Sequence, residues 1–169
     1  MKPVAKWLGW AVVAALVVIQ FVQPARTNPP VAPESAIFTQ TQMPEDVAAL
    51  LRRSCADCHS HETRWPWYSR VAPVSWVVVD DVNHARKHVN LSTWQSLTPK
   101  DAGKTLHEMC EEVSGGKMPL KSYLWMHREA ALSEAERQRL CAWTQQEETR
   151  LGPVPASTES KKEHEHSPR

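Results

Sequence analysis

The chain has few glycines, few tyrosines and phenylalanines, and almost no net charge. Its 169 residues include five glycines, two tyrosines and two phenylalanines, and the formal net charge is +1. This charge gives no basic surface of the kind that nucleic-acid-binding proteins carry, so we expect no nucleic-acid partner. No segment alternates convincingly between apolar and polar residues with a period of two, which argues against strands. These absences favour an all-α protein.

Tryptophan and proline are abundant instead. The sequence contains eight tryptophans, more than its tyrosines and phenylalanines together, and thirteen prolines. A chain with this composition has large flat apolar surfaces to bury. Either its own core or a flat apolar ligand could bury them.

One long uncharged apolar run occurs near the N-terminus, WLGWAVVAALVVIQFV at residues 7–22, and Lys2 and Lys6 precede it. As a helix this run spans ~24 Å, and the two apolar residues at 4 and 5 can extend it toward the ~30 Å of a bilayer core. No good pair of small residues marks a cleavage site. We therefore expect residues 1–24 to be an uncleaved signal anchor, a single transmembrane helix in the bacterial inner membrane with the remaining chain in the periplasm. The alternative is a cleaved signal peptide and a soluble periplasmic protein.

The rest of the chain divides by composition into a linker, a folded domain and a tail. Residues 25–42 are proline-rich and predict an extended, semi-rigid linker. Residues 43–152 carry the apolar patterns of a domain, and residues 153–169 are polar, charged and predicted to be disordered.

The domain reads as short helices joined by irregular loops. Pro44 suits the start of a first helix that ends between residues 54 and 58, and residues 75–88 predict a second. Thr98 caps a third helix that stops at residues 115–116, where two glycines follow one another. The sequence SEAE at residues 133–136 is a capping box for a last helix that ends near residue 152.

The stretch SCADCHSHETRWPWYS, residues 54–69, places Cys55, Cys58 and His59 in a C-x-x-C-H pattern. This is the pattern of covalent haem attachment. Two thiols on one helical turn can bond two vinyl groups on one porphyrin edge, and the next residue places an imidazole nitrogen on the iron. The export signal favours the same interpretation.

Two other chemistries use paired cysteines, and both fit less well. A structural zinc site needs four ligands, but Cys110 and Cys141 stand alone and supply no second pair. A thioredoxin-like redox pair sits in a βαβ pattern, which the sequence does not contain.

A haem iron usually takes a second axial ligand, and methionine is a common one. Met118 is the strongest candidate, because two glycines precede it, Pro119 follows it, and it lies 59 residues after His59. We expect Met109 to lie in the core, and Met126 to lie in the core or in the wall of a pocket. Histidines are the alternative ligands: His61, His84, His88, His107 and His127.

Residues 55–143 resemble the bacterial haem-binding domain family of monohaem c-type cytochromes. The motifs that carry the resemblance are CADCHSHETRWPWYS, APVSW at residues 72–76, GGKMP at residues 115–119, and the run from His127 to Trp143. The resemblance implies a small cytochrome c-like fold around one covalent haem c. It also implies that Cys55 and Cys58 attach the haem, that His59 is the proximal ligand and that Met118 is the distal candidate.

A haem site of this kind gives roles to further residues. The aromatic residues that we expect to pack against the haem or close its pocket are Trp65, Trp67, Tyr68 and Trp76. The carbonyl of Pro73, or alternatively of Pro66, is expected to accept the proton of the proximal imidazole. Arg64 could neutralise a haem propionate.

The two remaining cysteines, Cys110 and Cys141, are expected to form a disulfide, because haem consumes the other two and the compartment is oxidising.

The sequence predicts an electron carrier that exchanges electrons with redox partner proteins, with iron cycling between its ferric and ferrous states. The alternative is a peroxidase-like haem enzyme or a haem-based sensor of ligands or redox state, in which the second axial position is open. A third alternative is a structural module that binds zinc.

Overall fold

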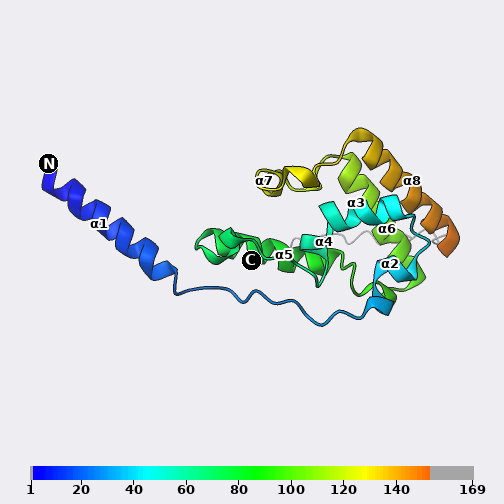
Figure 1. The fold of residues 1–169 in the computed structure, drawn as a ribbon, viewed down its shortest axis with the longest axis horizontal. Helices are drawn as coiled ribbons and strands as arrows, with labels where there is room; N and C mark the ends of the chain where they lie inside the picture. Colours follow the sequence, from blue (N-terminus) through cyan, green and yellow to red (C-terminus); the bar gives the residue numbers. More distant parts are fainter. Residues whose placement is uncertain (1, 153–169) are drawn as a thin grey trace, which may run out of the picture.

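The computed structural model describes residues 2–152. Over that range the chain forms helices and loops and contains no strand, as the all-α prediction requires. Figure 1 shows α1 (Lys2–Ile19) standing apart from the other helices, joined to them by an extended segment. The tail predicted to be disordered, residues 153–169, lies outside the described residues.

The predicted transmembrane helix is wrong. Among the helices between residues 2 and 152, none combines the length and the apolar character that crossing a bilayer requires. Helix α1 has 18 residues, and its bounds include Lys2 and Lys6. The uncharged part after Lys6 therefore spans only ~20 Å, well short of a ~30 Å bilayer core.

The core lies between α3 (Glu45–Ser54), α6 (Pro99–Ser114) and α8 (Glu134–Leu151), with α8 packed against both α6 and α3. Each helix turns an apolar stripe inward, as the sequence predicts. The fully buried large apolar side chains are Ile37, Val47, Leu51, Leu91, Leu106, Leu140 and Trp143. Ile37 begins α2 (Ile37–Gln40), so part of the stretch predicted as a linker packs into the domain.

Side-chain caps fix where the two longest core helices begin. The Thr98 hydroxyl accepts a hydrogen bond from the Asp101 backbone N–H at 3.2 Å, and Pro99 takes the first helical position of α6. Ser133 and Glu136 form the predicted capping box at α8, in which each side chain accepts from the other residue's backbone N–H. Both predicted helix starts are confirmed.

Residues 61–88 form a lobe outside this core. The lobe contains η2 (Trp67–Arg70) and α5 (Val74–His88), and it follows the short helix α4 (Ala56–His59). The remaining short elements are η1 (Pro33–Ser35), η3 (Trp94–Ser96), α7 (Lys121–Leu124) and η4 (Arg128–Ala130).

The chain closes the lobe with a clamp, which we define as the contacts between residues 59–61 and residues 89–92. The Leu91 N–H donates to the His59 carbonyl at 2.7 Å, and the His61 N–H donates to the Ser92 hydroxyl at 2.9 Å. The clamp also joins the core, because the Ile37 N–H donates to the Leu91 carbonyl at 2.8 Å. The position of His59 is thereby tied to both ends of the lobe.

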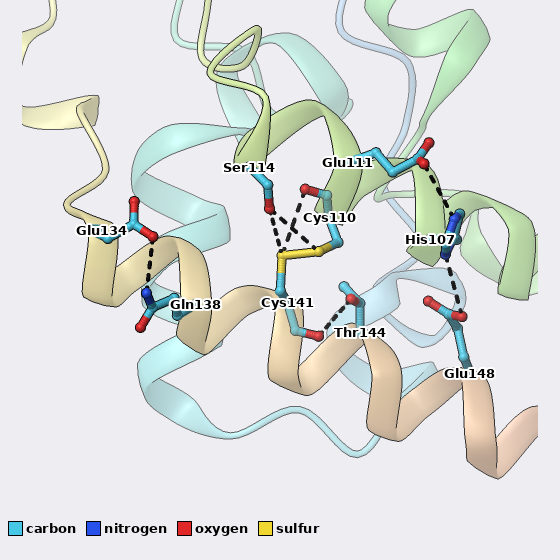
Figure 2. The surroundings of a disulfide bond; sticks show 9 residues. All are labelled: His107, Cys110, Glu111, Ser114, Glu134, Gln138, Cys141, Thr144 and Glu148. Carbon is cyan, nitrogen blue, oxygen red and sulfur yellow. Dashed lines mark hydrogen bonds and ion pairs between the residues drawn. A yellow bond between two sulfur atoms is a disulfide. The ribbon is translucent and has the colours of Figure 1, made fainter.

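A disulfide between Cys110 and Cys141 joins α6 to α8 (Figure 2). The Ser114 hydroxyl lies 3.2 Å from the Cys141 sulfur, and the two cysteines are 31 residues apart in the sequence. A crosslink over a loop of this length stabilises a protein mainly by restricting its unfolded chain.

We expect the double substitution Cys110→Ser/Cys141→Ser to lower the free energy of unfolding by about 3–4 kcal/mol, from the loop-closure entropy that the crosslink removes. Urea denaturation followed by circular dichroism measures this change. Ser114→Ala is the matched control, since it changes the same surroundings but leaves the bond intact, and it should cost less than about 0.5 kcal/mol. A double variant as stable as the wild type would contradict the prediction.

The capping box also predicts an acid-dependent part of the stability. Hydrogen bonds from the Ser133 backbone, the Arg53 side chain and the Ser133 hydroxyl lower the pKa of Glu136 to about 2. Arg53 belongs to α3, and its guanidinium lies 2.8 Å from the Glu136 carboxylate, so the same carboxylate joins two core helices. A lowered folded-state pKa stabilises the protein above the unfolded value and loses that effect as pH falls through the folded value.

Glu136→Gln is therefore expected to cost about 1 kcal/mol at pH 7. The difference from the wild type should shrink as pH falls from 4.5 toward 2, because the wild-type carboxylate becomes protonated over that range. Denaturation midpoints at several pH values measure it. Glu134→Gln, in the same helical turn, is the control and should give a small, pH-independent difference.

Candidate functional site

Cys55, Cys58 and His59 lie on a single turn between two helices. Helix α3 ends at Ser54, Cys55 precedes α4, and the N–H groups of Cys58 and His59 both donate to the Cys55 carbonyl, at 3.2 and 2.9 Å. Cys55 and Cys58 are both free thiols, although the same chain holds a disulfide elsewhere. Three reactive side chains are thus presented from one rigid piece of backbone.

The surroundings of both thiols keep them protonated. Burial raises the pKa of Cys55 to about 12, and burial together with the nearby Asp57 carboxylate raises the pKa of Cys58 to about 11. A structural zinc site needs four ligands. No group of three His, Cys, Asp or Glu side chains in the described part of the chain is arranged to hold a metal ion. The donor set therefore does not fit zinc.

The imidazole of His59 is oriented by the backbone of the clamp. Its Nδ1 lies 3.0 Å from the Val89 carbonyl, and burial lowers the pKa of the ring, which favours the neutral form. In the neutral ring Nδ1–H donates to that carbonyl, so Nε2 keeps its lone pair. A neutral imidazole with one nitrogen bound to a backbone carbonyl is a typical metal ligand.

The predicted acceptor for this proton, Pro73, is wrong, and so is the alternative Pro66. Pro73 is the N-cap residue of α5, whereas Val89 is the C-cap residue, so the whole 15-residue helix separates Pro73 from His59. The last carbonyl groups of a helix have no partner within it. This general rule, applied to the predicted end of the helix at residue 88, is a sequence signal from which Val89 could have been found.

Cys55, His59 and Met118 line one cavity, whose volume is about 490 Å³. Met118 reaches it because α6 ends just before, where Gly116 adopts a positive φ of 65° and the Met118 N–H donates to the Glu112 carbonyl at 3.1 Å. The left-handed conformation at Gly116 is one that glycine adopts without strain. His59, the predicted proximal ligand, and Met118, the predicted distal ligand, therefore line the same cavity although 59 residues separate them in the sequence.

Other candidate ligands share this cavity. Met109, which the sequence assigned to the core, lines it from α6, and His84 and His88 line it from α5 with their ring centres 4.5 Å apart. Three glutamates of α6 also line it, Glu108, Glu111 and Glu112, and their carboxylates pair with Lys104, His107 and Lys117 respectively. The other histidines proposed as ligands lie elsewhere: His61, His107 and His127.

The predicted aromatic residues do not line the cavity of His59. Trp67 and Tyr68 line a second cavity of about 430 Å³, which contains Cys58 and shares no lining residue with the first. Trp65 and Trp76 instead hold the extended segment that follows α1, through hydrogen bonds from their indole N–H groups to the Asn28 side chain at 3.2 Å and to the Val22 carbonyl at 2.7 Å. The prediction placed all four around one pocket because sequence proximity does not reveal which side of the lobe each residue faces.

Asp57, between the two cysteines, anchors a polar network. Its carboxylate accepts two hydrogen bonds from the Arg64 guanidinium, at 3.1 and 2.9 Å, and one from the Tyr123 hydroxyl at 3.0 Å. Burial alone would raise the pKa of Asp57, but these bonds outweigh it and hold the pKa below its ordinary value. Arg64, which the sequence offered for a haem propionate, is thus paired with a carboxylate of the chain itself.

The residues present fit a haem group. Two free thiols stand one helical turn apart, the adjacent imidazole is neutral with Nε2 unshared, and a thioether enters the same cavity. The cavity volume lies within the range of cofactor pockets. Thioether and imidazole are ligands that haem iron takes in electron-transfer proteins.

Comparison with known proteins agrees with this donor set. The family model of the haem-binding domain matches residues 14–146, which is most of the chain. No curated protein and no solved structure matches it. The geometry of the site and the family match lead to one conclusion: the chain belongs to the haem-binding domain family and binds haem.

Proposed function

We propose that the protein is a monohaem c-type cytochrome that carries electrons between redox partner proteins. One haem is bound covalently through thioethers to Cys55 and Cys58, with His59 as proximal ligand and Met118 as distal ligand. The observation that carries the proposal is that Cys55, His59 and Met118 line one cavity although Met118 is far from the others in sequence. Haem supplies an iron that changes between its ferric and ferrous states.

The chain's own part in this function is to hold the ligands still. The Val89 carbonyl fixes the tautomer and orientation of His59, and the clamp fixes the Val89 region in turn. The short turn after Gly116 holds Met118 through its backbone bond to Glu112. Electron transfer requires little rearrangement between redox states, and ligands positioned by rigid backbone suit that requirement.

Two features support export to an oxidising compartment, the bacterial periplasm. The disulfide between Cys110 and Cys141 is typical of proteins outside the cytoplasm. The apolar run at residues 7–22, preceded by Lys2 and Lys6, has the character of an export signal. Covalent haem attachment requires reduced Cys55 and Cys58, so haem attachment would have to precede their oxidation.

We expect the full-length chain, exported together with cytochrome c maturation factors, to retain one haem after denaturation. Intact mass spectrometry should show the mass of one haem added per chain, and Cys55→Ala/Cys58→Ala should remove that addition. Cys110→Ser/Cys141→Ser is the control and should keep it. A wild-type chain that releases its haem on denaturation would exclude covalent attachment.

The second prediction concerns the distal ligand. The ferric wild-type protein should show a low-spin spectrum with the weak near-infrared band of sulfur-to-iron ligation, and Met118→Ala should abolish that band. Met109→Ala is the matched control, because it removes a thioether from the wall of the same cavity, and it should retain the band.

Three other results would redirect the assignment. Loss of the band in Met109→Ala alone would make Met109 the ligand, and a low-spin spectrum without the band would indicate a histidine such as His88. A high-spin wild-type spectrum that changes with carbon monoxide or peroxide would mean an open iron, and would favour the enzyme or sensor over the electron carrier.

A further inference from the structure

Arg86, in the last turn of α5, joins two segments that are distant from each other in the sequence. Its Nε donates to the Ser60 carbonyl at 2.7 Å. Its two terminal nitrogens donate to the Thr27 carbonyl at 2.9 Å, to the Asn28 side chain at 3.0 Å and to the Thr63 hydroxyl at 2.8 Å. All three nitrogens of the guanidinium thus have acceptors, which hold the group in one position.

Two of these acceptors belong to the N-terminal arm, which we define as residues 20–30, the segment that follows α1. The arm is bonded to the lobe at several points. The Gln20 side chain exchanges two hydrogen bonds with the Ala72 backbone, at 2.9 and 3.0 Å, and the Arg26 guanidinium donates to the Ser69 carbonyl at 3.0 Å. The arm is therefore fixed against the lobe, and its acceptors are fixed with it.

The positive charge of Arg86 has no neutralising partner. Its four acceptors are all uncharged, whereas Arg64 of the same lobe is paired with the Asp57 carboxylate at 2.9 Å. Burial lowers the pKa of Arg86, and no carboxylate between residues 2 and 152 raises it. A guanidinium stays protonated in proteins nevertheless. The fold therefore keeps an uncompensated positive charge at this position.

This charge lies beside the backbone that carries His59. Ser60 directly follows His59 and is fully buried, and its hydroxyl donates to the Ala56 carbonyl, within the C-x-x-C-H motif, at 2.7 Å. Arg86 also precedes Val89, whose carbonyl accepts from the His59 ring, by less than one helical turn. A positive charge near an iron centre disfavours the ferric state, and the low dielectric of a protein interior strengthens this effect.

We propose that Arg86 raises the reduction potential of the bound haem by holding a positive charge against the backbone that carries His59. This role rests on the proposed function, in which His59 ligates the iron. The N-terminal arm takes part in it, because its two acceptors hold the guanidinium without neutralising it. Arg86 is not an iron ligand, and it lines neither of the two cavities described above.

The experiment is a spectroelectrochemical redox titration of the haem-loaded full-length chain and its variants. Arg86→Gln removes the charge, and we expect it to favour the ferric state about tenfold, which lowers the potential by about 59 mV. Arg86→Lys keeps the charge but cannot make all the bonds of the guanidinium, so it should destabilise the protein yet shift the redox equilibrium less than about threefold. A merely structural role predicts equal shifts in both variants, and that result would overturn the proposal.

Two further variants test the charge itself. Lys87→Gln is the matched control, because it removes the same charge from an exposed position of the same helix, where water and salt screen it, and it should shift the equilibrium less than about twofold. Asn28→Asp leaves Arg86 intact but places a carboxylate against its guanidinium, so it should lower the potential as Arg86→Gln does.

An unchanged potential in Arg86→Gln would overturn the proposal, provided that the variant keeps the wild-type haem absorption spectrum. If Arg86→Gln fails to fold, Asn28→Asp decides in its place, and an unchanged or raised potential there would overturn the proposal. Failure of the proposed function has a different signature, a wild-type chain without a low-spin haem spectrum, and would overturn both.

Discussion

The site depends on one hydrogen bond, from Nδ1 of His59 to the carbonyl of Val89. That bond sets the ring's orientation, and the backbone clamp around it sets the position of Val89. Because the clamp joins residues 59–61 to residues 89–92, the 27 residues between them can project as a separate lobe without loosening His59. The imidazole is thus held by the core, and the lobe is free to form the second cavity.

The four cysteines have two different chemical environments in one small domain. Cys110 and Cys141 are joined across two long core helices, which fixes the wall from which Met109 enters the cavity. Cys55 and Cys58 lie at a helix junction where burial keeps them as thiols. A raised pKa makes a thiol a poor partner in disulfide exchange, since the thiolate is the reactive form. The structure therefore keeps the disulfide-bonded pair, Cys110 and Cys141, apart from Cys55 and Cys58, which stay as free thiols.

Local sequence signals predicted much of the fold. Thr98 and Ser133 marked helix starts that the structure confirms, because a cap acts through neighbouring backbone atoms. The C-x-x-C-H motif is local in the same sense. The transmembrane prediction was wrong because it extended the apolar helix to residue 22, whereas α1 ends at Ile19 and includes Lys2 and Lys6 at its start. The prediction that the Pro73 carbonyl accepts the His59 proton was wrong. Which carbonyl accepts it depends on where the 15-residue helix α5 ends in space, and the sequence pattern alone does not give that position.

The cavity of His59 places two opposing influences on any iron bound there. A thioether ligand such as Met118 favours the ferrous state and raises the reduction potential. Glu108, Glu111 and Glu112 line the same cavity from α6, and negative charge favours the ferric state, but each of these carboxylates is paired with a basic side chain, Lys104, His107 or Lys117. We therefore expect substitutions that break these ion pairs on α6 to lower the reduction potential of a bound haem without changing its axial ligands.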